Sequence, residues 1–164
     1  MELRNPDGTV IERLGFLSGP VSLHEENFYD KSSPIFLAQQ NFEADHAGNE
    51  IDTNLLQVEG GHLKLLKAID SQTNQMDDIL LIHGGGAFNQ GEWKLAPSKT
   101  DKNVDILTKF NRCLQGCSGA AEQPNQKFQV EYSRYHFDGR QWVVHEKIVP
   151  ESAEGTQSGD EYPD

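Results

Sequence analysis

The chain has 164 residues, 35% of them hydrophobic and 24% charged, and is long enough for one domain with one core. Its 14 basic and 26 acidic residues give a formal charge of −12, which repels nucleic acid and anionic lipid. The charge either forms a solvated acidic surface or attracts a basic protein partner. No apolar stretch approaches the roughly 20 residues of a membrane span, so we expect no spanning segment.

We expect a mainly β fold, an antiparallel meander or sandwich of about 7–9 short strands with at most one short helix. Turn-forming residues recur about every ten to fifteen positions, which suits short strands better than alternating strands and helices. The predicted organisation is a single β-rich domain over residues 1–150 and a polar, acidic C-terminal tail over 151–164.

Three segments give clear local predictions in the first half of the chain. Asn5-Pro6-Asp7-Gly8 predicts a turn, and Gly60-Gly61 predicts a tight hairpin between residues 55–58 and 63–69. The run Ile79-Leu80-Leu81-Ile82 is the most apolar in the chain, and we expect it to be a central strand of the core.

Residues 101–116 fit two periodicities. A helical face would contain Ile106, Leu107, Phe110, Cys113 and Leu114. A strand would alternate through Val104, Ile106, Thr108 and Phe110. We favour the helix, because Thr100 or Asp101 can cap its start and Gly116 suits the position just beyond its end.

The chain has two cysteines, Cys113 and Cys117. A zinc site would need further thiolates or closely spaced imidazoles, and the sequence supplies neither. The Cys-x-x-x-Cys spacing favours a short-loop disulfide in an oxidising compartment, with two buried thiols in a reducing compartment as the alternative.

Residues 128–149 give the strongest hairpin signal, because Asp138-Gly139 lies between two aromatic and β-branched stretches. A two-residue type I′ turn there would place Tyr135 opposite Trp142 in the core. The same register would bring two glutamates face to face, so we predict a β-bulge at Ser133-Arg134 that restores favourable pairing.

Two motifs resemble functional loops but lack the residues that complete them. His83-Gly84-Gly85-Gly86 resembles an esterase oxyanion loop, yet no Gly-x-Ser-x-Gly nucleophile elbow accompanies it, so a flexible turn is the better interpretation. Asp101-x-Asn103-x-Asp105 opens like an EF-hand, but isoleucine and arginine stand where that loop needs glycine and glutamate. The better interpretation of these residues is that they cap the start of the expected helix.

Catalytic arrangements of side chains are not evident. Asp77-Asp78 and Glu25-Glu26 are adjacent pairs whose side chains point to opposite faces of a strand, unlike the two carboxylates of a glycosidase. The six histidines share with serine, cysteine or aspartate no short motif of the kind that marks a nucleophilic triad. We therefore assign no catalytic residue, metal ligand or cofactor, and we expect a protein that is not an enzyme.

The candidate binding residues are one aromatic side chain and three acidic ones. Trp93 and Glu92 follow a polar stretch and are expected on an exposed loop, where a tryptophan can stack on a sugar or anchor a protein interface. Asp77 and Asp78 supply negative charge toward a basic partner. Trp142, by contrast, is expected in the core.

One resemblance to known proteins comes from the aromatic hairpin Tyr132-Ser133-Arg134-Tyr135-His136-Phe137-Asp138-Gly139-Arg140-Gln141-Trp142 and from the ending Tyr162-Pro163-Asp164. These stretches resemble the C-terminal part of small exported proteins of Gram-negative bacteria. Some of those proteins resemble immunity lipoproteins, which protect a cell from its own secreted antibacterial toxins. The resemblance covers roughly the last third of the chain and implies no particular site residue.

The sequence thus supports two functional hypotheses. The first is a non-catalytic binding protein of the bacterial cell envelope, such as an immunity protein or inhibitor that binds a basic toxin or enzyme. The alternative is a carbohydrate- or peptidoglycan-binding β-sandwich module that uses Trp93. A hydrolase whose acid and base come from distant carboxylates is a third, less favoured hypothesis.

The expected location depends on the start of the chain. MELRNPDGTV lacks the features of a signal peptide, so we expect a cytoplasmic protein if the chain is complete as given. If an export or lipidation segment has been removed, we expect a periplasmic or secreted protein.

Overall fold

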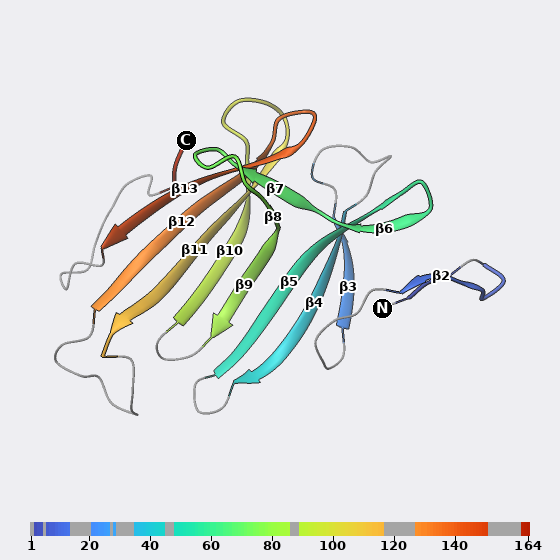
Figure 1. Cartoon of the computed structure of the whole chain (residues 1–164), viewed down its shortest axis with the longest axis horizontal. Helices are drawn as coiled ribbons and strands as arrows, with labels where there is room; N and C mark the ends of the chain where they lie inside the picture. Colours follow the sequence, from blue (N-terminus) through green and yellow to red (C-terminus); the bar gives the residue numbers. More distant parts are fainter. Residues whose placement is uncertain are drawn as a thin grey trace.

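The computed structural model shows an all-β protein with no helix in the residues it describes (Figure 1). Those residues are 2–4, 6–13, 21–26, 28, 35–44, 48–85, 89–116, 127–150 and 162–164. The strands are β1 (Glu2–Arg4), β2 (Val10–Arg13), β3 (Val21–Glu26), β4 (Ile35–Ala44), β5 (Gly48–Glu59), β6 (His62–Leu65), β7 (Lys67–Asp70), β8 (Met76–Asp78), β9 (Leu80–Gly85), β10 (Asn89–Pro97), β11 (Val104–Gln115), β12 (Lys127–Phe137) and β13 (Trp142–Pro150).

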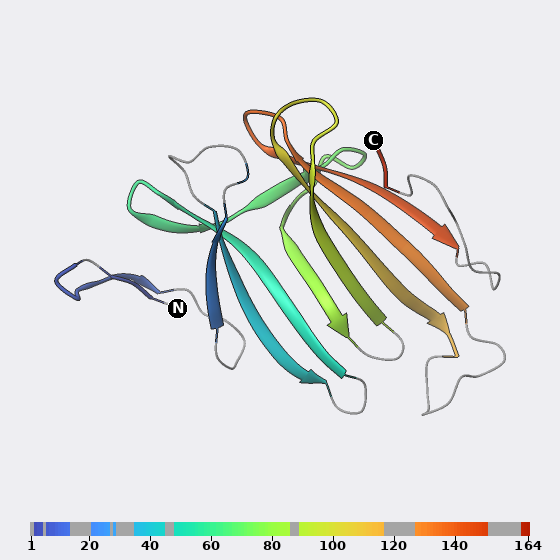
Figure 2. The same cartoon turned by 180° about the vertical axis from the view of Figure 1, so that it is seen from behind.

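Eleven strands form one sheet in the order β3-β4-β5-β9-β10-β11-β12-β13-β7-β8, with β6 paired to β5 (Figures 1 and 2). β1 and β2 form a separate hairpin. Neighbouring strands of the sheet are antiparallel, except that β13 and β7 are parallel. The predicted mainly antiparallel β fold is confirmed. The estimate of about 7–9 strands is too low, partly because residues 63–69 divide into two strands.

Leu66 separates β6 from β7, so two consecutive stretches pair with different partners. β6 pairs with the end of β5, and β7 pairs with β13, so one short stretch of the chain, residues 62–70, connects two distant parts of the sheet. The Leu66 N–H donates to the carbonyl of Leu55 at 2.8 Å, and the Leu66 carbonyl accepts from the Ile79 N–H at 2.9 Å. The long strands consequently converge where β6, β7 and β8 cross them and spread apart at the other end (Figures 1 and 2).

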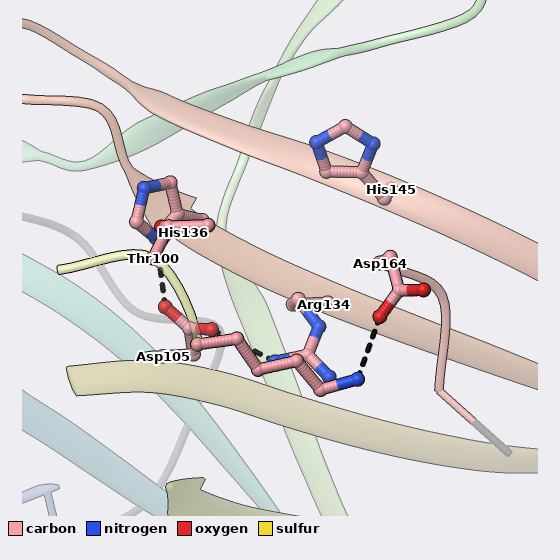
Figure 3. A pocket seen from close by; sticks show the side chains of 7 residues that line it. Thr100, Asp105, Arg134, His136, His145 and Asp164 are labelled. Carbon is pink, nitrogen blue, oxygen red and sulfur yellow. Dashed lines mark hydrogen bonds and ion pairs between the residues drawn. The ribbon is translucent and has the colours of Figure 1, made fainter. Parts of the chain in front are cut away.

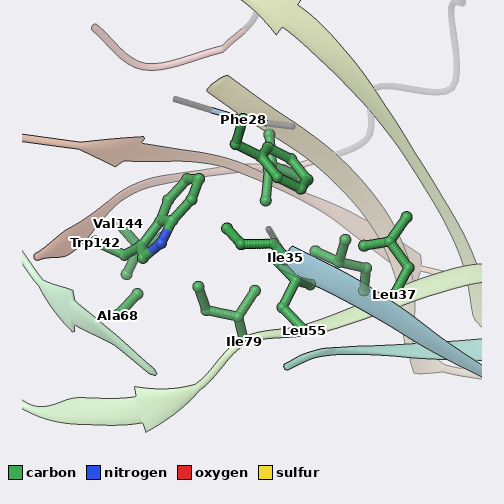
Figure 4. Packing of buried hydrophobic residues seen from close by; sticks show 10 residues of the cluster. Phe28, Ile35, Leu37, Leu55, Ala68, Ile79, Trp142 and Val144 are labelled. Atoms are coloured by element: carbon green, nitrogen blue, oxygen red, sulfur yellow. The ribbon is translucent and has the colours of Figure 1, made fainter. Parts of the chain in front are cut away.

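The hydrophobic core lies at this crossing, around Trp142 (Figure 4). The indole is 3% exposed, stands edge-on to Phe28 at a centroid distance of 5.7 Å, and lies 5.8 Å from Phe137. Burying one such large apolar side chain stabilises the fold by about 1.5–3 kcal/mol. The predicted core position of Trp142 is therefore confirmed. The buried residues of the cluster are Phe28, Ile35, Leu37, Leu55, Ala68, Ile79, Leu81, Ile106, Trp142 and Val144.

Both turns predicted in the first half of the chain are present. Gly60 and Gly61 have φ angles of 59° and 82° and join the paired ends of β5 and β6. Two successive positive φ angles are what a type I′ hairpin turn requires. Between β1 and β2, the carboxylate of Asp7 accepts a hydrogen bond from the Thr9 N–H at 2.8 Å, which closes that turn.

The most apolar run of the chain is buried on one face only. Ile79 and Leu81 belong to the core, whereas Leu80 is 42% exposed, so the predicted core strand is confirmed for alternate residues. Gly84 and Gly85, expected in a flexible turn, instead end β9 with φ angles of 80° and 120°. A β-carbon at either glycine would collide with the backbone of a neighbouring strand.

The prediction of a helix in residues 101–116 is wrong, because the segment contains strand β11. β11 pairs with β10 along one edge and with β12 along the other, which satisfies its backbone groups as in a central strand. Burial of the three consecutive residues Asp105, Ile106 and Leu107 conceals the alternation expected of a strand. Asp101 organises the turn before β11, where its carboxylate accepts from the backbone N–H two residues later at 2.8 Å.

The hairpin of β12 and β13 has a four-residue loop, 138–141, so the predicted two-residue turn is wrong. The predicted β-bulge at Ser133-Arg134 is also wrong, because the pairing runs through both residues without a shift. Phe137 lies opposite Trp142. Asp138 lengthens the loop, since its carboxylate accepts from the N–H groups two and three residues later, both at 2.8 Å.

Two predicted C-terminal features lie partly outside the described residues. Cys113 lies near the end of β11, but Cys117 is outside the described part, so the disulfide stays a prediction. Residues 151–161 of the predicted tail are likewise outside it, whereas 162–164 are described and lie against the sheet. Within the described ranges, no helix has the length and apolarity needed to cross a bilayer.

Candidate functional site

A groove of about 200 Å³ lies on one face of β11, β12 and β13. Strand register places Thr108, Ser133 and Glu146 beside one another on that face, one from each strand. Leu80 and Ile82 of β9 complete the lining with apolar surface. The charged residues of the groove are Glu92, Lys109, Arg112, Glu131 and Glu146.

Two of the groove's glutamates have basic partners. Glu131 accepts two hydrogen bonds from the Arg112 guanidinium at 2.9 and 3.2 Å, and one from the Gln129 amide at 2.7 Å. Such a forked pair holds both planar groups in a fixed geometry. The carboxylate of Glu92 lies 3.5 Å from the ammonium of Lys109. These two pairs largely offset their own charges.

Glu146 is the groove carboxylate for which the described part of the chain supplies no ion-pair partner. Partial burial raises the pKa of Glu146, and the negative charges of Asp70, Glu131 and Asp77 raise it further. Ionised Glu146 thus stands in the field of three other carboxylates. A positive group beside it would relieve that repulsion.

Tyr135 lines the same groove next to Glu146. Burial raises the pKa of Tyr135 to about 12, and the charges of Glu146 and Asp77 add to the effect. The phenol therefore stays protonated at neutral pH, with a hydroxyl that can donate or accept a hydrogen bond. Ser133, which is 8% exposed, places a second hydroxyl in the lining.

The structure brings one of the predicted binding residues into the lining of this groove, a second near it, and leaves two elsewhere. Glu92 lines the groove, and Asp77 is close enough to influence Glu146 and Tyr135. Asp78 lies 3.4 Å from the ammonium of Lys67. Trp93 was expected on an exposed loop, but residues 89–97 form strand β10, and its ring is partly buried against the core.

A second polar cluster lies on the opposite face of β11–β13, beside a cavity of about 370 Å³ (Figure 3). One oxygen of Asp105 accepts from Arg134 at 2.9 Å, and the other lies 2.8 Å from Nδ1 of His136. The remaining ring nitrogen of His136 is 3.6 Å from Asp101. Asp105 and Arg134 are almost fully buried, so each charge depends on the other.

This second cluster was missed in the sequence, where Asp105 counted only as the third residue of an EF-hand-like motif. In the structure, Asp101 bonds Asn103 and Asp105 bonds Arg134, while His136 lies between the two carboxylates of the motif. A signal was available: Asp105 stands between apolar residues of a strand, where a charge requires a buried partner. Identifying Arg134 as that partner requires the register of β11 against β12.

The two clusters can bind charged groups. Within the described residues, no group of three histidine, cysteine, aspartate or glutamate side chains converges as metal ligands would. The bond between Asp105 and His136 orients an imidazole, yet the described lining of its cavity includes neither serine nor cysteine as a nucleophile.

Comparison with known proteins does not assign the chain to a family. No family model, no curated protein and no solved structure gave a significant match. Function therefore has to follow from the geometry of the chain itself.

Proposed function

We propose that the chain is a non-catalytic binding protein that receives a lysine or arginine side chain of a basic protein partner beside Glu146. The position of Glu146 carries this proposal. Its carboxylate lies near Asp70, Asp77 and Glu131, and none of the described residues forms an ion pair with it. A cation entering the groove would be attracted by Glu146 and by the neighbouring carboxylates of Asp70 and Asp77.

The groove has the size and chemistry for a single side chain. Its volume of about 200 Å³ is below the roughly 300–1,000 Å³ of small-molecule pockets. Ser133 and Tyr135 offer hydroxyl oxygens beside the carboxylate, which suits the several N–H donors of lysine or arginine. Leu80 offers apolar surface for the aliphatic stem of such a side chain.

The charge of the whole chain supports the same partner. A formal charge of −12 steers a basic protein toward the chain over distances set by the Debye length, about 10 Å at 0.1 M salt. We therefore expect the association rate to fall as salt rises, with a smaller effect on dissociation.

The cell-envelope version of this proposal is an immunity protein or inhibitor that covers a basic toxin or enzyme. It is supported by the resemblance of residues 132–142 to small exported bacterial proteins and by the spacing of Cys113 and Cys117. A thiol assay on the unfolded, unreduced protein tests the location. No reactive thiol is expected for an exported protein, and two reactive thiols would favour a reducing compartment.

Replacing Glu146 tests the binding proposal. Immobilised wild-type chain, Glu146→Gln and Glu25→Gln are exposed to an extract of the source organism at low and high salt, and the affinity of the retained protein is measured. Glu25→Gln is the matched control, because it makes the same charge change on exposed β3, at the other end of the strand order. We expect a basic protein that binds Glu146→Gln about tenfold more weakly than the control. Equal affinity for both variants would refute the role of Glu146.

We do not adopt the carbohydrate-binding alternative, because it relies on Trp93 as a stacking surface. The ring of Trp93 packs against the hydrophobic core, and the other predicted residues are carboxylates. Glycan binding that is lost in Trp93→Ala while the fold is retained would revive that alternative.

A further inference from the structure

The face of β11–β13 opposite to the groove carries a pocket lined by lysine, arginine and histidine side chains together with two aspartates. Lys99, Arg134, His136 and His145 line a cavity of about 370 Å³, beside Asp105 and Asp164 (Figure 3). Arg134 and His145 are directly opposite each other on β12 and β13, so both project from the same face. The guanidinium of Arg134 and the ammonium of Lys99 carry several N–H donors, so this cavity can hold the oxygen atoms of an acidic segment.

The segment Tyr162–Asp164 already lies against this face, and its first residue makes an aromatic contact. The ring of Tyr162 stands edge-on to the ring of Tyr132 at a centroid distance of 5.3 Å. The ammonium of Lys94 lies 5.4 Å from the centroid of the Tyr162 ring. An edge-to-face pair and a cation–π contact together require an aromatic residue at this position of the segment.

The next two residues of the segment bind through oxygen atoms. The carbonyl of Pro163 accepts a hydrogen bond from Nε of Arg134 at 2.6 Å. The side-chain carboxylate of Asp164 accepts from the ammonium of Lys99 at 2.6 Å. Arg134 is 6% exposed, and a buried guanidinium needs acceptors for its N–H groups. The carbonyl of Pro163 supplies one of these acceptors.

We propose that this pocket is a recognition site for acidic peptide segments in which an aromatic residue precedes a carboxylate by two positions. Tyr162–Asp164 occupy the site as a tethered resident, and a partner protein with a segment of the same chemistry displaces them. Tyr132 contacts the ring, Arg134 the backbone carbonyl and Lys99, in the turn before β11, the carboxylate; three different partners are the pattern of peptide binding and not of binding to any anion. The site is separate from the Glu146 groove and selects the opposite charge.

The resident is exchangeable because its outer contacts are exposed. The side chains of Asp164 and Lys99 are 88% and 43% exposed, and exposed ion pairs are weak. The segment keeps its place because a tethered ligand acts at an effective concentration on the order of millimolar. A free peptide should therefore compete poorly with the intact segment and well once that segment is disabled.

The test measures binding of a fluorescent peptide to the full chain by polarisation. The peptide has the sequence Asp-Glu-Tyr-Pro-Asp, as in residues 160–164, and is acetylated and amidated so that only side chains carry charge. The double variant Tyr162→Ala, Asp164→Asn disables the resident without altering the sheet. We expect this variant to bind the peptide at least about tenfold more tightly than the unsubstituted chain.

Two further substitutions in the double variant locate the binding. Lys99→Gln should weaken the peptide several-fold, because it removes the partner of the carboxylate. Lys102→Gln, the same charge change at an exposed position of the same turn, should leave binding unchanged. Circular dichroism confirms that each variant is folded.

Competition separates a peptide from a simple anion. Unlabelled peptide should displace the probe, whereas the same peptide with alanine for tyrosine, or succinate alone, should displace it much less. Equal binding by the unsubstituted chain and the double variant would overturn the proposal. So would equal binding by the Lys99 and Lys102 variants, or displacement by succinate as effective as by the peptide.

Discussion

The guanidinium of Arg134 lies 2.9 Å from the carboxylate of Asp105, and the two side chains are 7% and 2% exposed. Removing two charges from water costs several kcal/mol per ion, which good geometry and additional hydrogen bonds must offset. His136 supplies one such bond to Asp105, and the Pro163 carbonyl supplies one to Arg134. The pair thereby links β11, β12 and the C-terminal segment.

Breaking this pair should be costly. We expect Asp105→Asn to lower the free energy of unfolding by about 3–5 kcal/mol, because it leaves the Arg134 charge buried without its counterion. Urea unfolding of the two proteins measures the difference. In Asp105→Leu, Arg134→Met, where both charges are absent, the loss should be much smaller. A loss below about 1 kcal/mol in Asp105→Asn, as for an exposed pair, would show that water reaches Arg134.

Tyr135 should make the fold sensitive to alkali. Its pKa in the folded chain is raised from 10.0 to about 12, so the protonated phenol favours folding. This contribution is fully present below pH 10 and is lost as the pH rises toward 12. A difference of two pH units corresponds to about 2–3 kcal/mol. We expect urea midpoints of the wild type to fall more steeply than those of Tyr135→Phe across this range, and parallel curves would contradict a buried phenol.

Glu146 should oppose folding at neutral pH. Because its folded-state pKa is raised, the stability that its protonated form contributes is fully present below the ordinary value of 4.5 and is lost as the pH rises through the folded-state value. Calorimetry should give Glu146→Gln a higher Tm than the wild type at pH 7, and the two values should converge in acid. Glu25→Gln controls for net charge. A lower Tm for Glu146→Gln at pH 7 would indicate an ion pair that stabilises Glu146.

Gly91 marks the close approach of β9 and β10. A β-carbon there would lie 2.6 Å from the carbonyl oxygen of Ile82 and 2.9 Å from its β-carbon. Because the nearest atom belongs to the backbone, we expect Gly91→Ala to cost about 1–3 kcal/mol in guanidinium unfolding. Gln90→Ala, at the exposed neighbouring position, should change stability by less than about 0.5 kcal/mol. Equal stabilities of Gly91→Ala and Gln90→Ala would indicate that β9 and β10 lie further apart at Gly91.

The positions of the turns could be predicted from the sequence, whereas the register of the strands could not. Gly60-Gly61 and Asp138-Gly139 both mark turns, because positive φ angles favour glycine. The loop at Asp138 nevertheless has four residues instead of two, since the aspartate side chain closes a longer turn. That difference depends on one hydrogen-bonding side chain, and it changed every cross-strand pair predicted for the hairpin.

The residues of the candidate sites could be predicted only in part, again because the sequence does not give the strand register. Asp77 and Glu92 could be selected as acidic residues, but their relation to Glu146 depends on the pairing of β7 with β8 and of β10 with β11. The helix predicted for residues 101–116 also separated Asp105 from Arg134. Charge composition predicts a class of partner, while strand pairing decides which charges meet.

The parallel pairing of β7 with β13 has a consequence for biosynthesis. Ala68 lies opposite Trp142, so β7 has its inner neighbour only after most of the chain has left the ribosome. Contacts between such distant parts of a chain form slowly. Until β13 arrives, the edge of β7 lacks this neighbour, and we expect newly made protein to be most prone to aggregate during that interval.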